Sequence, residues 1–395
     1  MRLLWLSRYM PLPAVSGDVN YTRQLAGALA QAGISITFLG LVSRETDLAA
    51  YRRVSATIDW VPVNAVPRRT PWALVSRLPL QTARFATTGF IAAVSHQLHT
   101  ATFDAVVIDY YALGWALPLL RRIAPRSLVI YVSHNFEAAA ARDIAQSFQG
   151  NRLKRAALRI NAKKIAALER RLTVSADLLT VITDADGLRY QALGPKRPAL
   201  TLRPCYAGSK RAERTITSAV PRRLIVLGSF TWIAKQINLV QFLGSADAVF
   251  ARHGIEVRII GSVAGQLMRQ WTPHLKAIHF EGFVPDLFGC FDQARMGLVI
   301  ETTGGGFKLK TLDYIFGRLP VAALAHALAG IPAKVQQHFL VQNTLDALVR
   351  DVCRYIDDYD RLNTMQHGAF AAADDQFDWA VNGTRLADRI RQFRP

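Results

Sequence analysis

The feature that most constrains the fold is an alternation between short apolar runs and longer amphipathic segments. The apolar runs are continuous and rich in Leu, Ile and Val, which is typical of strands buried on both faces of a parallel sheet. Between them lie segments with helical spacing, such as residues 19–32, whose following Gly33 suits a helix C-cap. The first series predicts strands at residues 3–6, 34–39, 105–108, 128–132 and 178–182.

The alternation stops and then starts again later in the chain. From Pro204 to Pro221 the sequence turns to Ser, Thr, Lys, Arg and Gly, which is typical of an exposed connection between domains. Two consecutive βαβ arrays predict an α/β protein with two Rossmann-like, doubly wound domains facing across a cleft, with ligands beyond the carboxyl ends of the strands. The expected divisions are 1–204, a linker at 205–222, 223–376 and a terminal segment at 377–395. The second series predicts strands at residues 224–227, 256–260, 278–281, 297–300, 321–324 and 338–341.

Length and composition agree with two folded domains. The chain has 395 residues, of which 51% are hydrophobic, enough for two buried cores. Its longest apolar stretch, from Tyr110 to Leu120, is shorter than the roughly 18 residues of a membrane span, and the first residues lack the features of a signal peptide. We therefore expect a cytoplasmic protein.

The net charge of +19 is unevenly distributed, with most of the basic excess before Cys205. Much of it falls in a predicted helix at residues 152–171, with Leu153, Leu158, Ile165 and Leu168 expected on another side of that helix. We therefore expect this basic helix to bind an anionic surface. Because no aromatic residues interleave with these bases and no nucleic-acid motif is present, we favour a membrane, on the inner face of the plasma membrane, over nucleic acid. A solvated helix with an accidental charge run is the alternative.

A second candidate for a membrane contact is the segment Pro67–Leu98. It opens with Arg68, Arg69 and Trp72, and basic residues beside aromatics suit a membrane interface or a lipid-tailed acceptor. Ordinary packing onto the N-terminal sheet explains the pattern equally well. The apolar positions that decide between the two are Leu74, Leu78, Leu80, Phe85 and Phe90.

The sharpest motif follows the predicted strand at 297–300. Gly304, Gly305 and Gly306 let the backbone approach a phosphate, and the start of the following helix favours an anion. Lys308 and Lys310 add positive charge, and the sequence does not decide which of them faces the phosphate. Asp313, on the same helix, can accept two hydrogen bonds from a ribose diol, or can simply be an acid favourable to the helix dipole.

This string, which runs on to Gly317-Arg318-Leu319-Pro320-Val321, resembles the donor-binding motif of glycosyltransferases of the GT-B fold, particularly the large family 4 and its relatives. The resemblance extends over most of the chain. Further similar segments are 223–232 with Gly228 and Ser229, 280–287 with Phe283 and Val284, 377–379, the loop at Gly17, and Ser133-His134-Asn135-Phe136-Glu137.

The resemblance implies a sugar transfer from a nucleotide-diphosphate donor to a hydroxyl of a glycan or lipid-linked acceptor. It implies an acceptor domain at 1–204, a nucleotide-sugar domain at 223–376 and a terminal helix that crosses back to the N-terminal domain. Two departures concern the donor. The family's first acidic residue would fall at Gly305 and is missing, with Glu301 upstream as a candidate substitute, and Lys235 is either a second diphosphate ligand or a surface residue. A non-catalytic nucleotide-sugar-binding protein of the same fold is the alternative function.

Two residues are candidates for chemistry on the acceptor side. His134 can position the acceptor or act as a base, or it can be a satisfied core histidine. Asp18 can act as a base in an inverting mechanism or can cap the helix that follows it. No cofactor and no metal are expected, because lysine and a helix dipole supply the positive charge. Asp184-Ala185-Asp186 has the form of a metal-binding Asp-x-Asp, and a helix cap is the preferred interpretation.

Overall fold

The computed structural model describes residues 1–12, 16–42, 51, 57–70, 76–148, 151–302 and 306–393. The chain divides into two compact units. The N-terminal unit comprises Met1–Pro204 together with Asp378–Pro395, and the C-terminal unit comprises Cys205–Phe377. The segment 205–222, which we expected to be a linker, is therefore grouped with the C-terminal unit.

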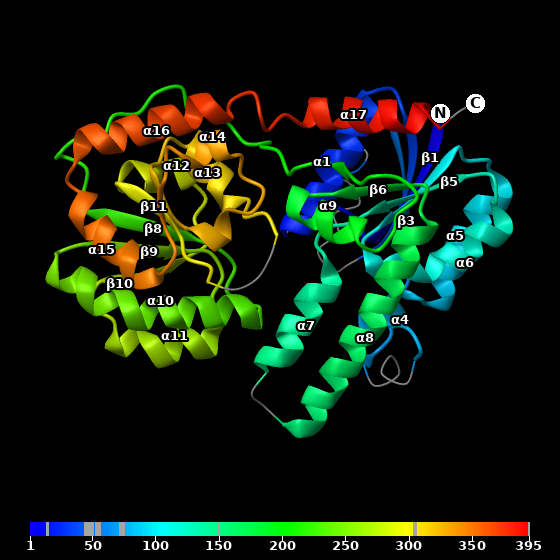
Figure 1. The fold of residues 1–395 in the computed structure, drawn as a ribbon, viewed down its shortest axis with the longest axis horizontal. Coiled ribbons are helices and arrows are strands. Elements are labelled where there is room, and N and C mark those ends of the chain that lie inside the picture. The colour runs from blue at the N-terminus through cyan, green and yellow to red at the C-terminus, as the bar shows by residue number, and fades with distance from the viewer. Residues whose placement is uncertain are drawn as a thin grey trace. The chain divides into compact units, whose positions relative to one another are not determined.

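The N-terminal unit contains a parallel sheet in the order β3-β2-β1-β4-β5-β6-β7 (Figure 1). Its central strands are buried along almost their whole length, because helices and loops cover both faces. The strands are β1 (Arg2–Tyr9), β2 (Ser35–Leu41), β3 (Ile58–Val63), β4 (Ala105–Asp109), β5 (Leu128–Val132), β6 (Leu178–Val181) and β7 (Leu200–Thr201).

The last helix, α17, packs inside the N-terminal unit against the first, α1. Gly383 allows the close approach, since a Cβ there would lie 2.3 Å from the carbonyl oxygen of Ala28. The rings of Tyr21 and Trp379 meet edge to face, with centroids 5.4 Å apart. The helices of this unit are α1 (Gly17–Gln31), α4 (Leu80–Phe85), α5 (Thr88–Thr100), η1 (Tyr111–Ala116), α6 (Leu117–Ile123), α7 (Glu137–Ser147), α8 (Arg152–Ser175), α9 (Asp184–Gln191) and α17 (Trp379–Arg391).

The C-terminal unit repeats the architecture with a sheet in the order β10-β9-β8-β11-β12-β13. Figure 1 shows α10 and α11 on one side of this sheet and α13, α14 and α16 on the other. Two doubly wound parallel sheets confirm the predicted fold class. The elements are β8 (Arg223–Leu227), α10 (Ile233–Arg252), β9 (Glu256–Ile260), α11 (Gly265–Trp271), η2 (Thr272–His274), β10 (Ile278–Gly282), α12 (Leu287–Asp292), β11 (Met296–Val299), α13 (Lys310–Phe316), β12 (Val321–Leu324), η3 (Ala325–Leu328), α14 (Ala333–Gln336), β13 (Leu340–Gln342), α15 (Leu345–Tyr355) and α16 (Tyr359–Ala373).

Tyr314 fixes α13 onto the C-terminal sheet. Its buried hydroxyl accepts a hydrogen bond from the backbone N–H of Leu227 at 2.8 Å, where β8 ends. Gly297 makes room for the ring, because a Cβ there would lie 2.7 Å from it. The helix that begins with Lys310 is therefore held at a defined place above the ends of β8 and β11.

Some sequence expectations are corrected. Strand β3 was not predicted because Asp59 and Pro62 break its apolar run, which an edge strand tolerates. The connection after Pro204 is not simply exposed. Arg214 is 7% exposed and donates to the carbonyl oxygens of Arg318 and Phe291 at 3.0 and 2.6 Å.

Helix α8 also differs from its prediction. Ile165 and Leu168 are buried as expected, but Leu153 is 80% exposed, because it lies on a different face of the helix. For the segment Pro67–Leu98, ordinary packing is correct for Phe85 and Phe90, which lie in the core of the N-terminal unit. Trp72 and Leu74 lie outside the described residues.

Candidate functional site

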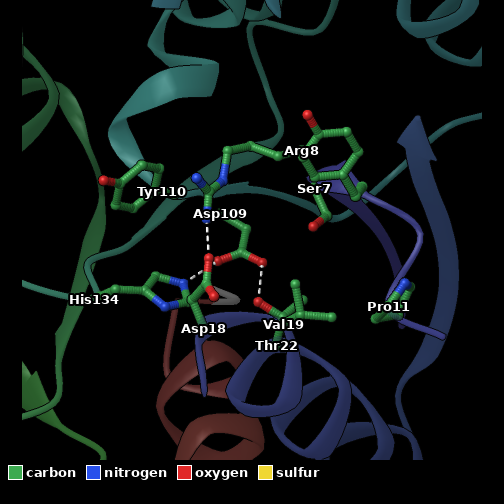
Figure 2. A pocket seen from close by; sticks show the side chains of 10 residues that line it. Ser7, Arg8, Pro11, Asp18, Val19, Thr22, Asp109, Tyr110 and His134 are labelled. Atoms are coloured by element: carbon green, nitrogen blue, oxygen red, sulfur yellow. Dashed lines mark hydrogen bonds and ion pairs between the residues drawn. The ribbon is translucent and has the colours of Figure 1, made fainter. Parts of the chain in front are cut away.

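A small polar pocket opens at the carboxyl ends of β1, β4 and β5 in the N-terminal unit (Figure 2). This edge is where parallel α/β sheets bind ligands. Residues from three strand ends and from the first turns of α1 converge there. The side chains that line it include Arg8, Asp18, Thr22, Asp109, Tyr110 and His134.

Asp109 and His134 form a buried pair at the floor of this pocket. The His134 Nε2 atom lies 2.6 Å from Asp109 Oδ1, and the two residues are 7% and 2% exposed. The other carboxylate oxygen accepts hydrogen bonds from Thr22 Oγ1 at 2.6 Å and from Trp5 Nε1 at 3.1 Å. Because an ionised carboxylate only accepts, Nε2 carries a proton, and Nδ1 is the ring nitrogen left to meet a ligand.

Asp18 is engaged in an ion pair with Arg8. Burial raises the pKa of Asp18, but the Arg8 guanidinium and a hydrogen bond from Ser16 outweigh it, so the pKa is lower than usual. Asp18 lies in the first turn of α1, directly after Gly17, the first residue of that helix. A carboxylate held in its charged form by a cation is a weak proton acceptor, so this geometry fits an ion-pair role better than a catalytic base.

Tyr110 has a strained backbone. Its φ is +79°, in the region that favours glycine, which costs about 1–3 kcal/mol for other residues. This conformation places the ring under the Arg8 guanidinium, 4.1 Å from the ring centroid, and edge to face with His134 at 5.7 Å. The Tyr110 ring therefore packs against both Arg8 and His134 at one side of the pocket (Figure 2).

Two acids lie side by side behind the pocket. Burial and the neighbouring Glu169 raise the pKa of Glu137 to about 7. Glu169, which is fully buried, accepts hydrogen bonds from the backbone N–H groups of Glu137 and Ala138 at 2.9 and 2.8 Å and from the Tyr190 hydroxyl. Glu169 thus ties α8 to the start of α7, directly after His134.

In the C-terminal unit the two lysines of the glycine-rich motif have different environments. Lys310 Nζ lies 2.6 Å from Glu301 Oε1, and both side chains are largely buried. Lys310 is therefore neutralised within the protein, and Glu301 is used for that purpose. Gly304 and Gly305 lie outside the described residues, and Gly306 has a φ of +80°, as the glycine turn requires.

Lys308 lies among other cations at the glycine turn. Its Nζ donates to the carbonyl oxygen of Gly306 at 3.1 Å. Burial lowers the pKa of Lys308 to about 8; Glu301 works against this shift, and the charges of Lys310 and Lys235 add to it. Positive charges that repel one another in a partly buried place are stabilised by a bound anion. The structure thus brings Lys235 within electrostatic range of Lys308.

Asp313 lies in the first turn of α13, as the motif predicts. Burial raises its pKa to about 7, and no described residue donates a hydrogen bond to its carboxylate. Gly228 and the exposed Ser229 directly follow β8. Phe283 is 86% exposed just after β10, with Val284 half-buried beside it.

The Asp-x-Asp sequence at the start of α9 is used structurally. The Thr183 hydroxyl caps the helix by accepting from the Asp186 backbone N–H, and it donates to the Asp186 carboxylate, while Asp184 pairs with Arg203. Within the described ranges, no three His, Cys, Asp or Glu side chains are grouped as a metal site would require. No helix in the described part of the chain is both long enough and apolar enough to span a membrane.

Arg8 and Asp109 were not among the predicted site residues. Each stands at the carboxyl end of a buried strand, which is a signal that the sequence did offer. Their partners, Asp18 and His134, come from other elements, so the sequence did not show which residues would pair.

Two known protein families match the chain, one in each of the two units. The family of 4-like glycosyl transferase domains matches residues 16–205, and the glycosyl transferases group 1 family matches residues 221–358. No curated protein sequence matches the chain. The chain belongs to the glycosyltransferases of the GT-B fold, with a 4-like N-terminal domain and a group 1 C-terminal domain.

Solved structures show the same fold at low sequence identity. Sucrose-phosphate synthase from Thermosynechococcus elongatus is 15% identical, with a TM-score of 0.72 over 99% of this chain and 98% of that one. HepE of Anabaena, in complex with UDP and glucose, is 13% identical, with a TM-score of 0.66 over 100% of both chains. WaaG, a glycosyltransferase involved in lipopolysaccharide biosynthesis, is 17% identical, with a TM-score of 0.64 over 99% of both.

Proposed function

We propose that this glycosyltransferase takes its sugar from a nucleoside-diphosphate donor and transfers it to a hydroxyl of a lipid-linked or polysaccharide precursor on the cytoplasmic side of the membrane. The observation that carries the donor assignment is the cationic turn at Lys308, where the positive charges of Lys308, Lys310 and Lys235 act on one another at the glycine turn. Complexes of HepE with UDP and with UDP-glucose support a uridine diphosphate donor.

In this scheme the residues of the C-terminal unit hold the donor. Lys308 and Lys235 contact the diphosphate together with the backbone N–H groups near Gly306. Asp313 accepts hydrogen bonds from the ribose, and the base lies near Phe283 and Val284. As the sugar leaves, negative charge grows on the diphosphate, so a preorganised lysine stabilises the transition state more than the ground state.

The N-terminal pocket acts on the sugar and the acceptor. Asp109 holds the His134 ring in one tautomer, and Nδ1 contacts a sugar or acceptor hydroxyl. The basic surface of this unit suits an acceptor with a polyprenyl-diphosphate anchor, and WaaG, involved in lipopolysaccharide biosynthesis, is a relative that supports a glycan acceptor.

The test combines binding with turnover. A thermal-shift panel of nucleoside diphosphates and their sugars should show stabilisation of about 2.7 kcal/mol at a hundred times the dissociation constant. The stabilising donor is then incubated with lipid-linked acceptors, and release of the nucleoside diphosphate is followed. A donor that binds and is neither transferred nor hydrolysed would favour a non-catalytic binding protein.

We also propose that no divalent metal is needed, since lysine supplies the charge. Activity should persist in excess chelator, and its loss on chelation with recovery on adding Mg²⁺ or Mn²⁺ would contradict this part of the proposal.

A further inference from the structure

Helix α8 (Arg152–Ser175) presents a surface that carries positive charge and no negative charge. Its one acid, Glu169, is fully buried and faces the start of α7. The neighbouring α7 exposes one base and one acid, Arg142 and Asp143, which offset each other. The basic residues of α8 are Arg152, Lys154, Arg155, Arg159, Lys163, Lys164, Arg170 and Arg171.

The same helix exposes apolar side chains in a stripe. Leu153 is 80% exposed and Ile160 is 55% exposed. They are two turns apart and therefore on one face, on which the exposed Ala156 and Ala167 also lie. The inward face is a different one, formed by Ile165, Leu168 and Leu172.

The helical spacing places a row of cations along one side of this stripe. Arg152, Arg159, Lys163 and Arg170 form that row, and Lys164 and Arg171 lie in line with the stripe, nearer the C-terminal end of the helix. An apolar stripe beside a basic row is the pattern of a helix that lies in a membrane interface.

The protein holds this face in a fixed orientation. Figure 1 shows α7 and α8 side by side, extending away from the sheet of the N-terminal unit. At the outer end, Arg155 Nε donates to the carbonyl oxygen of Phe148 at 3.1 Å. Further along, Lys164 Nζ donates to the carbonyl oxygen of Ser76 at 2.6 Å, and Asn161 accepts from the N–H of Leu80 at 2.8 Å.

We propose that this outward face of α8 docks the protein on an anionic lipid bilayer, with Leu153 and Ile160 entering the interface and the flanking bases facing the headgroups. Nucleic acid would satisfy the cations but leave both apolar side chains in water, so the stripe favours a bilayer. The inference deepens the proposed function by naming where that enzyme meets its membrane, and it requires no assumption about the sugar.

The experiment is co-sedimentation of the full chain with vesicles of phosphatidylcholine, with and without phosphatidylglycerol. One variant replaces Arg152, Arg159, Lys163 and Arg170 by Gln. The matched control replaces four exposed bases elsewhere, Arg269, Lys334, Arg350 and Arg385, and so has the same net charge.

We expect binding to anionic vesicles only, and a loss of about a hundredfold or more in the α8 variant, at about fivefold per basic residue. The control should keep most of the binding. Leu153→Ser with Ile160→Ser should weaken binding about tenfold, whereas Leu188→Ser, at a residue that is 75% exposed on α9, should leave it unchanged.

Equal losses in the two four-residue variants would overturn the proposal, because net charge alone would then explain binding. Equal binding to neutral vesicles, or no effect of the two apolar changes, would overturn it as well. Binding of UDP, measured on every variant by calorimetry, reports on the donor site separately, so a failure here is distinguishable from a failure of the proposed function.

Discussion

At the scale of single residues, substitution of the two lysines of the glycine-rich motif should have different effects, one on donor binding and the other on stability. If Lys308 binds the diphosphate as proposed, Lys308→Ala removes a charge-assisted hydrogen bond, so we expect donor binding to weaken by about 10- to 150-fold with little change in stability. Lys310→Ala leaves Glu301 charged and buried without its partner, which costs about 3–5 kcal/mol of folding free energy. Calorimetric titration and urea unfolding of both variants measure the two effects.

The contrast between the variants is the control. If Lys310→Ala weakened donor binding while leaving the urea midpoint unchanged, the assignment of the two lysines would have to be exchanged.

Donor binding should depend on pH in a bell-shaped manner. The Asp313 carboxylate accepts hydrogen bonds from ribose only when ionised, above its pKa of about 7. The Lys308 ammonium is charged only below its pKa of about 8. Affinity should therefore fall below the first value and above the second. In titrations across this range, Asp313→Asn should remove the acidic limb alone, and a profile unchanged by that substitution would count against the ribose role.

Asp109 should act through His134. Asp109→Asn keeps the shape of the side chain but stabilises the other histidine tautomer, and a misplaced catalytic group can cost about 100-fold in rate. We expect kcat to fall by that order while the affinity for UDP, measured by calorimetry, stays the same. Thr22→Val, which removes only a hydrogen bond to Asp109, should have a smaller effect on kcat in the same direction.

At the scale of secondary-structure elements, the ends of β8 and β9 depend on one glycine. Gly261 has a φ of +120°, and a Cβ there would lie 2.1 Å from the carbonyl oxygen of Gly228. Gly261→Ala should therefore cost more than about 3 kcal/mol in urea unfolding and should disturb the donor turn. The control is Gly27→Ala within α1, where nothing lies within 4 Å, and it should stabilise by about 0.5–1 kcal/mol.

The elements also show what the sequence could and could not predict. The strands at 128–132, 256–260 and 321–324 were predicted with their observed bounds, because each is an apolar run bounded by polar residues or turns. Leu153 was misplaced because its position on the helix puts it on a different face from Ile165 and Leu168. The Asp109–His134 and Lys310–Glu301 pairs are set by the meeting of different elements, so composition and spacing could not show them.

At the scale of the whole molecule, the two units should respond differently to donor. If the donor residues all belong to Cys205–Phe377, UDP at about a hundred times its dissociation constant should raise the unfolding transition of that unit by about 2.7 kcal/mol and leave the other unchanged. Scanning calorimetry with and without UDP measures this. A variant lacking residues 379–395 should lose stability in the N-terminal unit and keep its response to UDP.

The return of α17 to the N-terminal unit has a consequence for synthesis. Domains commonly fold one after another as they emerge from the ribosome, starting with the first. Here the first unit lacks the helix that carries Trp379, Leu386 and Ile390, all buried in it, until the other unit has been translated in full. During that interval the nascent N-terminal unit exposes an apolar surface along α1. We therefore expect chaperones that bind apolar surfaces to associate with the chain while it is being translated rather than after its release.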